Sequence, residues 1–357
     1  MNRSVPSILF LACAAGVARA SSSPADDWLS LDREIASLAQ ATSPAQEGEK
    51  KGIKVSGYIK TQYDYSGDER YQPDPETDLS GVGFEGLRVT FTGEIEGYEL
   101  KLSIDGKDGT FKLKDGYVRF ALAESIHAQM GQFKSRFLFS AFASDEKLNT
   151  YRRTFLGNAY GERDPGLQLD AQFGPLIAVA QAQNGDDEAG DEWALTGKLI
   201  LAAMGQALEK QAGGFGPEAE TALTFGLGYF DDGAIDNTTA LSAEAMFTSG
   251  PLWAHAEISD QDDGFTGLTG GPAKKAGSLS DTTPWTATLA FALSEQFELV
   301  GRYEDEDDSD DTTTVLAGVN YYVNGHALKW QLNYATTDSD DPEQDGDLFT
   351  LGLFVAV

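Results

Sequence analysis

Polar and apolar residues alternate one for one through the last 43 residues of the chain, which read "VLAGVNYYVNGHALKWQLNYATTDSDDPEQDGDLFTLGLFVAV" (315–357). In a β-strand, successive side chains point to opposite faces. No apolar run here is long enough to cross a membrane as a helix. The pattern predicts strands with one apolar face, formed by Val319, Tyr321, Leu328, Trp330, Leu332, Tyr334, Phe349, Leu351, Leu353, Val355 and Val357. The opposite face is polar, with Lys329, Gln331 and Asn333.

The same period of two extends back to about residue 54. It changes parity near Asp115 and Gly116, which predicts a β-bulge. The pattern predicts sixteen strands, near residues 54–66, 83–96, 98–105, 110–122, 125–134, 165–174, 176–184, 191–203, 220–231, 237–249, 251–260, 282–293, 295–305, 312–323, 326–337 and 347–357.

The connections between these strands alternate in length. Long acidic segments such as "NGDDEAGDE" and "DSDDPEQDGD" follow odd-numbered strands, and short turns such as "SGP" and "VNGH" follow even-numbered ones. One even connection, "GQALEKQAGGFGPEAE", is longer than this rule expects. Short turns at one end and long loops at the other are typical of bacterial outer-membrane barrels.

Hydrocarbon cannot satisfy backbone N–H and C=O groups, so a sheet that spans a membrane must close on itself. The sequence therefore predicts an all-β fold, a sixteen-stranded antiparallel transmembrane β-barrel, over residues 54–357. A barrel of this size is too wide for side chains to fill and holds water. A secreted β-sandwich or propeller is the alternative, but sixteen runs with long loops at one end suit it poorly.

The N-terminus reads "MNRSVPSILFLACAAGVARA". Arg3 gives a basic start, residues 5–17 are apolar, and Ala18-Arg19-Ala20 resembles a cleavage site, so residues 1–20 are predicted to be a signal peptide. The single cysteine, Cys13, lies within this segment, so the mature chain cannot use disulfides. Export to the outer membrane of a Gram-negative bacterium is the location that these features indicate together.

Residues 21–53 are predicted to form a short periplasmic helix and a linker. Trp28, Leu31, Ile35 and Leu38 have the spacing of a coiled-coil seam, over fewer than three heptads. Such a seam can join subunits or belong to a lone amphipathic helix, and the spacing leaves both open.

The composition limits the possible chemistry. The chain has 57 acidic and 26 basic residues, which argues against nucleic acid as a partner. His255, Ser259 and Asp260 are the only grouping that suggests a catalytic site, and a wall histidine beside an acidic loop explains them better. We therefore expect no enzyme. The stretch 341–346 resembles a calcium loop but has Gly352 where a glutamate is needed. We expect no cofactor, and only weak divalent cations at acidic surface loops, where they would bridge lipopolysaccharide.

Basic residues are concentrated early in the chain, with 20 of the 26 at or before Arg163. The longest connection, about 135–164, contains several of them and many aromatic residues, which suggests a packed loop. Long loops in compact folds are usually functional. The candidate pore-lining and selectivity residues are Lys60, Arg88, Lys101, Arg119, Lys134, Arg136, Lys147, Arg152, Arg153 and Arg163.

Three stretches resemble a known family. "AQMGQFKSRF" (128–137) is similar to the signature that precedes the third loop of the phosphate-selective porins O and P. "VNYYVNGHALKWQLNYA" and "LVGRYEDEDD" resemble strands near that family's C-terminus. The resemblance implies a homotrimer of sixteen-stranded pores, each with its third loop folded inward, and often a periplasmic coiled coil before the barrel.

The expected function is that of an outer-membrane porin for passive diffusion of small hydrophilic solutes and ions, with a weak to moderate preference for phosphate-like anions. The acidic loops keep a cation-leaning general porin open as an alternative. A structural or adhesive barrel with a plugged lumen is another.

Overall fold

A computed structural model of the chain describes residues 52–67, 79–107, 110–185, 193–232, 239–262 and 281–357. The chain divides into two compact units, residues 1–52 and 53–357. The predicted signal peptide and the helix with its coiled-coil seam lie outside the described residues. The second unit is the predicted barrel.

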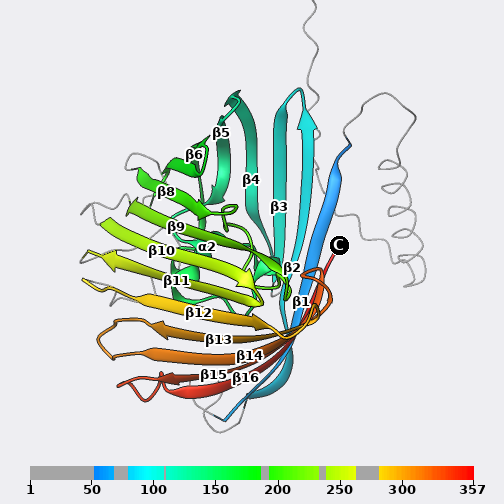
Figure 1. Cartoon of the computed structure of the whole chain (residues 1–357), viewed down its shortest axis with the longest axis vertical. Helices are drawn as coiled ribbons and strands as arrows, with labels where there is room; N and C mark the ends of the chain where they lie inside the picture. Colours follow the sequence, from blue (N-terminus) through cyan, green and yellow to red (C-terminus); the bar gives the residue numbers. More distant parts are fainter. Residues whose placement is uncertain (1–51, 68–78, 108–109, 186–192, 233–238, 263–280) are drawn as a thin grey trace, which may run out of the picture. The chain divides into compact units, whose positions relative to one another are not determined.

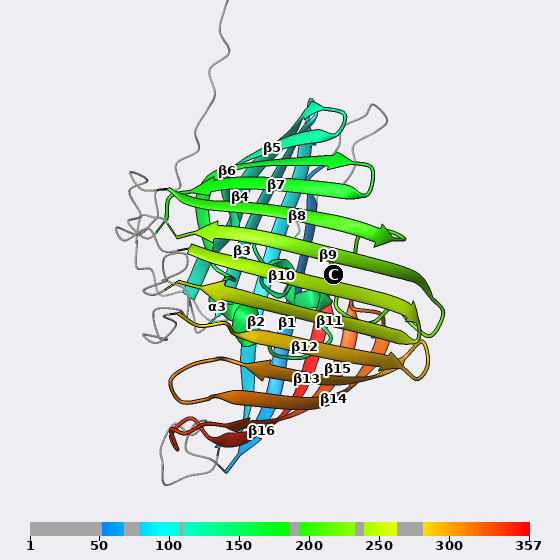
Figure 2. The ribbon, with the colours of Figure 1, turned by 60° about the vertical axis from the view of Figure 1, so that its left-hand side comes forward.

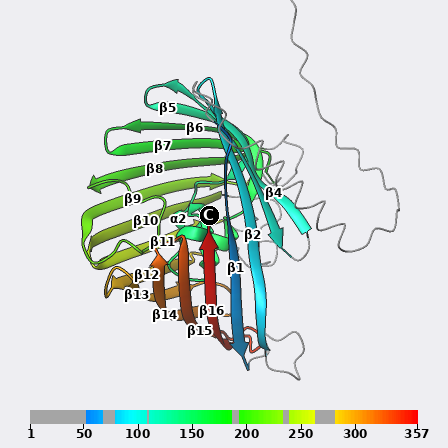
Figure 3. The same ribbon diagram turned by 90° about the vertical axis from the view of Figure 1, so that its right-hand side faces the viewer.

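Sixteen strands form one closed sheet in which each strand pairs with its neighbours in the sequence and β16 pairs back with β1 (Figures 1 and 3). The pairing is antiparallel throughout. The predicted fold class is confirmed. The strands are β1 (Lys54–Ser66), β2 (Leu79–Ile95), β3 (Tyr98–Lys107), β4 (Thr110–Ala123), β5 (Ile126–Lys134), β6 (Arg163–Phe173), β7 (Leu176–Gln183), β8 (Ala194–Met204), β9 (Ala219–Asp231), β10 (Thr239–Gly250), β11 (Leu252–Gln261), β12 (Trp285–Ala292), β13 (Phe297–Asp305), β14 (Thr313–Asn324), β15 (Leu328–Asp338) and β16 (Gly346–Ala356).

The two faces of each strand follow the alternation of the sequence. In β15, Lys329 and Gln331 are at most 2% exposed and point inward, whereas Trp330, Leu332 and Tyr334 are 38 to 48% exposed on the outside. In a closed barrel the backbone N–H and C=O groups pair within the sheet, and an apolar outer surface can face the hydrocarbon of the lipid. These are the properties of a transmembrane β-barrel. Among the helices that the structure describes, none is long and apolar enough to span a membrane.

The predicted bulge is present one residue earlier than the sequence placed it. Ser103 of β3 pairs with Asp115, but the next residue, Ile104, pairs with Leu113, so Lys114 is the extra residue. The bulge lets Leu113 stay on the outer face while Asp115 becomes a buried residue of the lumen.

The two ends of the barrel differ as predicted (Figure 2). At one end, which we call the turn end, most hairpins are tight. The β2–β3 turn at Glu96 and Gly97 has positive φ angles of 50° and 83°, the geometry that suits a two-residue hairpin. Two long acidic connections that the structure describes, residues 306–312 and 339–345, lie at the opposite end, the loop end. The exception at the turn end is the β8–β9 connection, residues 205–218, which returns into the barrel.

Residues 135–162, which we call the inner loop, lie inside the barrel between β5 and β6, where Figure 1 shows α2 within the ring of strands. The inner loop contains α2 (Phe139–Phe142), the 3₁₀ turn η2 (Asp145–Lys147) and α3 (Phe155–Ala159). Arg163 and Asp164, which the sequence placed in this loop, are the first residues of β6.

Candidate pore constriction

The inner loop packs against one half of the barrel wall through apolar contacts. Two buried clusters join it to β8–β10 and to β10–β14, and both contain inner-loop aromatics. Phe137 and Phe139 are at most 4% exposed. The packing explains why a 28-residue connection of this composition carries so many aromatic residues.

Wall glycines make room for two of these aromatics. A Cβ atom on Gly352 of β16 would lie 1.9 Å from the ring of Tyr151, and one on Gly228 of β9 would lie 2.9 Å from the ring of Phe137. Glycine within a strand often marks a close approach of another group. Gly352 and Gly228 therefore leave the space that the rings of Tyr151 and Phe137 occupy.

Two wall carboxylates hold the start of α2. Glu244 accepts a hydrogen bond from the Phe139 amide (2.8 Å), and Glu257 accepts one from the Ser140 amide (3.1 Å). Lys198 donates to the Phe137 carbonyl (3.0 Å) and pairs with Glu244 (2.7 Å). Such charge-assisted bonds to otherwise unpaired helix amides stabilise this end of the inner loop.

The later part of the inner loop is hydrogen-bonded by side chains of β13–β15 and β1. The bonds are from Lys329 to the carbonyls of Glu146 and Leu148, from Asn320 to the Asn149 carbonyl, from Arg302 to the Arg152 carbonyl, from the Tyr151 amide to Asn333, and from Lys60 to the Tyr151 carbonyl. Most of these donors are side chains of the wall that bind backbone oxygens of the loop. The loop is therefore fixed along its whole length, from β8 round to β1.

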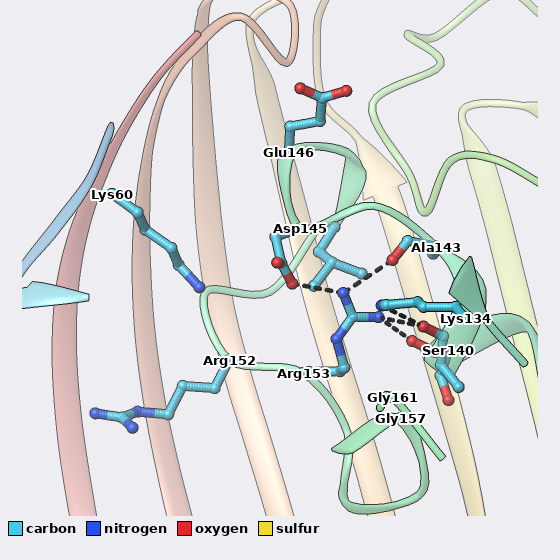
Figure 4. A network of polar contacts seen from close by, with 12 residues as sticks. Lys60, Lys134, Ser140, Ala143, Asp145, Glu146, Arg152, Arg153, Gly157 and Gly161 are labelled. Atoms are coloured by element: carbon cyan, nitrogen blue, oxygen red, sulfur yellow. Dashed lines mark hydrogen bonds and ion pairs between the residues drawn. The ribbon is translucent and has the colours of Figure 1, made fainter. Parts of the chain in front are cut away.

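Arg153 organises the middle of the inner loop, as Figure 4 shows. Its guanidinium donates to the carbonyls of Ser140, Ala141 and Ala143 and pairs with the Asp145 carboxylate. The side chain is 8% exposed. Arg153 therefore ties three segments of the loop together.

A glycine allows this arrangement. A Cβ on Gly157 would lie 2.6 Å from Arg153 Cγ and 2.9 Å from the Ser140 carbonyl oxygen. Thr154 begins α3 by accepting a hydrogen bond from the Gly157 amide (2.9 Å). The close packing of α3 on Arg153 therefore requires glycine at this position.

Asp145 connects the inner loop to the free half of the wall. It accepts a hydrogen bond from the Tyr58 hydroxyl (3.1 Å) and lies 3.6 Å from a guanidinium nitrogen of Arg88. Burial disfavours the charged form of Asp145, but the cations Arg153, Lys134 and Arg88 outweigh burial and hold the pKa of Asp145 well below its usual range. Asp145 is therefore an anion that neutralises part of the surrounding positive charge.

Two cavities remain beside the inner loop. The loop-side cavity has a volume of about 510 Å³ and reaches Glu306 and Thr337 near the loop end. The turn-side cavity has a volume of about 520 Å³ and reaches Ser56 and Thr92 near the turn end. Both are bordered by Tyr58, Arg88, Lys134 and Arg163, and hence they adjoin at these four residues.

All ten residues predicted from the sequence to line the pore border these cavities. Lys60, Arg152 and Arg153 border the loop-side cavity, Lys101, Arg119, Arg136 and Lys147 border the turn-side cavity, and Arg88, Lys134 and Arg163 border both. The structure thus brings these residues together. Their role in selectivity stays a prediction.

The described lining is much more basic than the chain as a whole. Thirteen basic and nine acidic residues border the two cavities, whereas the whole chain has 26 basic and 57 acidic residues. The excess is larger on the turn side, with eight basic and three acidic residues, than on the loop side, with eight and six. Half of the chain's basic residues therefore face the free space of the barrel.

Many of these cations are paired. The ion pairs are Arg88 with Asp105 and Asp145, Lys101 and Arg163 with Asp115, Arg119 with Asp170, Arg136 with Glu209, Arg152 with Asp64, Arg153 with Asp145, and Arg302 with Glu304. Lys60 and Lys134 instead donate to the carbonyls of Tyr151 and Ala141, each at 2.6 Å. Within the described part of the chain, no carboxylate lies within 4 Å of either of these two ammonium groups. Their ammonium groups are therefore bonded to neutral backbone oxygens of the inner loop.

The sequence did not identify several lining residues. Lys114 was hidden because it is the extra residue of the bulge, and Lys210 lies in the β8–β9 connection, of which the sequence showed only the unusual length. The wall acids that pair with the predicted cations were also missed. The signal for Asp105 and Asp170 is their place in the alternation, on the same face as Arg88 and Arg119.

The other candidate groupings are placed as follows. His255 and Ser259 point inward from β11, but Asp260 is exposed on the opposite face, and Ser259 instead bonds the Tyr160 hydroxyl (2.8 Å). In the calcium-like stretch, Asp341 accepts a hydrogen bond from the amide of Glu343. Among the described residues no group of three or more His, Cys, Asp or Glu side chains could hold a metal ion.

The sequence matches no protein-family model and no curated protein. Solved structures match the barrel. A double mutant of the Rh. blastica porin gives a TM-score of 0.57 at 10% identity, over 85% of this chain and 100% of that one. OmpT of Vibrio cholerae, an outer membrane protein, gives 0.55 at 13% identity as a loop-deletion mutant, over 85% of this chain and 99% of that one. OmpF of Salmonella typhi, in complex with daunomycin, gives 0.55 at 11% identity, over 86% of this chain and 98% of that one.

The chain has the fold of outer-membrane porins. With its apolar outer face, this is the architecture of a Gram-negative outer-membrane barrel. The matches do not single out the phosphate-selective porins among proteins of this fold.

Proposed function

We propose that this barrel is an outer-membrane porin that lets small hydrophilic solutes and ions diffuse passively, with a weak to moderate preference for phosphate-like anions. The observation that carries the proposal is the lining of the two cavities, which contains half of the chain's basic residues. A net charge of −31 for the chain as a whole does not oppose it, because the described excess of acid lies away from these cavities.

Distance decides which charges matter to a permeating ion. Two unit charges 4 Å apart interact by about 1 kcal/mol even in bulk water, whereas exposed charges are largely screened beyond about 8 Å at physiological salt. An ion that passes between the cavities comes close to Arg88, Lys134 and Arg163. Selectivity acts where the path is most confined. We infer that these cations outweigh the more distant acidic loops.

The acidic loops support a cation-leaning pore as the second candidate. The β13–β14 connection, residues 306–312, has four aspartates at the loop end. The sign of the selectivity separates the two candidates, and the reversal potential in a KCl gradient reports that sign.

A plugged structural barrel is the third candidate, because the inner loop and the β8–β9 connection both occupy the lumen. Purified protein in a planar lipid bilayer is expected to give large, stepwise increases in conductance, since two cavities of about 500 Å³ adjoin beside the inner loop. Folded, heat-modifiable protein that inserts but stays silent would contradict the porin proposal and favour the plug.

We also propose that the porin is a homotrimer, on the basis of the family resemblance and the coiled-coil seam at residues 28–38. Closed cyclic symmetry is the usual form of such assemblies. Deletion of residues 21–50 is expected to lower the temperature at which the trimer dissociates on a gel and to leave the barrel folded. An unchanged temperature would mean that this segment is only a tether. Lipopolysaccharide and bridging divalent cations at the acidic loops remain proposed partners.

A further inference from the structure

The two cavities differ in their chemistry. Among described residues, the loop-side cavity has only Tyr58 and Phe155 as aromatic lining, whereas the turn-side cavity has Tyr58, Tyr117, Phe133 and Phe142. Phe142 and Tyr117 are partly exposed, whereas Phe133 is 3% exposed and meets Tyr117 edge to face with ring centroids 6.5 Å apart. The turn-side cavity therefore offers accessible ring surface from both the inner loop and the wall.

Cations lie over these rings. The Arg136 guanidinium carbon is 4.7 Å from the centre of the Phe142 ring, and the Lys101 ammonium is 5.7 Å from that of Tyr117. Aromatic faces attract cations electrostatically. Each accessible ring thus has a positive group beside it, so apolar surface and positive charge occur together.

The positive charge of this cavity is not fully compensated. Asp115 is shared by two cations, Lys101 (2.8 Å) and Arg163 (2.7 Å). Lys147 and Lys210 also border the cavity. In the ranges that the structure describes, neither lies within 4 Å of a carboxylate. A carboxylate that enters the cavity therefore meets several cations that can bind another anion.

The β8–β9 connection completes the cavity at the turn end. Glu209 pairs with Arg136, and the Ala212 amide donates to the Lys147 carbonyl (2.9 Å), so the connection is joined directly to the inner loop. Glu209 and Lys210 then border the cavity. This unusually long turn gives the cavity a wall that a tight hairpin would lack.

We propose that the turn-side cavity is a binding site for aromatic carboxylates, with the ring of the solute against Phe142 and Tyr117 and its carboxylate near Lys101, Lys147 and Lys210. Aromatic pairs and charge-assisted hydrogen bonds favour this pose. A volume of about 520 Å³ is typical of small-molecule sites. The inference rests on the proposed anion preference and names a class of anion that the pore retains longer than chloride.

Benzoate and acetate test the site, because they share the carboxylate and differ in the ring. With purified full-length protein in a planar bilayer, millimolar benzoate is expected to reduce the chloride current at a concentration roughly three- to ten-fold lower than acetate, the range that one aromatic contact gives. Equal inhibition by the two anions would overturn the proposal.

Two inner-loop phenylalanines provide matched variants. Phe142→Ala is expected to remove the advantage of benzoate over acetate, whereas Phe155→Ala, which changes the loop-side cavity, is expected to keep it. Phe142→Leu keeps apolar volume without the ring and serves if the alanine variant does not assemble. Equal benzoate inhibition of the Phe142 and Phe155 variants would contradict the assignment. A cation-selective wild type would overturn the proposed function instead, and the reversal potential in KCl reports that separately.

Discussion

Replacement of Arg153 by methionine is expected to loosen the middle of the inner loop. The Arg153 guanidinium bonds the carbonyls of Ser140, Ala141 and Ala143 and pairs with Asp145, with 8% of the side chain exposed. The three carbonyls are buried, and loss of a hydrogen bond to a charged group costs about 1.5–3 kcal/mol. A local loss of 3 kcal/mol raises the population of the open loop by about 100-fold.

Limited digestion with chymotrypsin measures this opening, because cleavage follows the population of the open form when opening is fast. Cleavage after Phe139 or Phe142 is expected to be about 100-fold faster in Arg153→Met than in wild type. The matched control is Arg152→Met. Arg152 is 44% exposed and pairs with Asp64, and such exposed pairs contribute about 0–1 kcal/mol. Equal protection of the two variants would refute the organising role of Arg153.

Reversal of two lining charges is expected to move the selectivity of the pore toward cations. Arg152→Glu with Lys147→Glu changes one residue at each cavity, and neither side chain supports the backbone of the inner loop. An interaction of about 1 kcal/mol per unit charge at contact distance corresponds to roughly a five-fold change in partition. The permeability ratio of chloride to potassium should therefore fall by at least roughly five-fold.

The control makes the same change in net charge at the rims of the barrel. Lys54→Glu with Lys112→Glu alters two exposed residues that border neither cavity. Screening beyond about 8 Å should leave the permeability ratio of this control nearly unchanged. If the rim variant shifts the ratio as much as the lining variant, selectivity comes from the total charge and not from the constriction.

Strand number, strand positions and the inward face of each strand could be predicted from the sequence, because burial against lipid on one side and water on the other forces a period of two. Lys329, Gln331 and Asn333 were assigned to the lumen on this basis, and all three are buried there. The bulge was predicted within one residue, because an inserted residue changes the parity of everything after it.

The ten basic residues could be chosen by parity and by their concentration before Arg163. The structure gives this concentration a physical explanation. The inner loop packs against β8–β14, and the turn-side cavity borders β1–β6, where most of the early basic residues lie.

The contacts of the inner loop could not be predicted, since alternation gives the face of a residue and not its partner across the lumen. Arg152 and Arg153 are adjacent in sequence and both border the loop-side cavity, yet Arg153 supports the fold of the loop while Arg152 is exposed. The position of Asp145 between Arg153 and Arg88 depends on the folded loop. The sequence showed that the connection at residues 205–218 is unusually long, but not that it returns into the barrel.

The reversal potential of the wild-type pore in a KCl gradient is the most direct test of the proposed selectivity. If the basic lining sets the selectivity, the reversal potential should have the sign of an anion-selective pore. Lowering the ionic strength should strengthen the preference for anions, because screening decreases. A cation-selective sign that the Arg152→Glu, Lys147→Glu variant does not change would contradict the account, because the distant acidic loops and not the lining of the cavities would then set the selectivity.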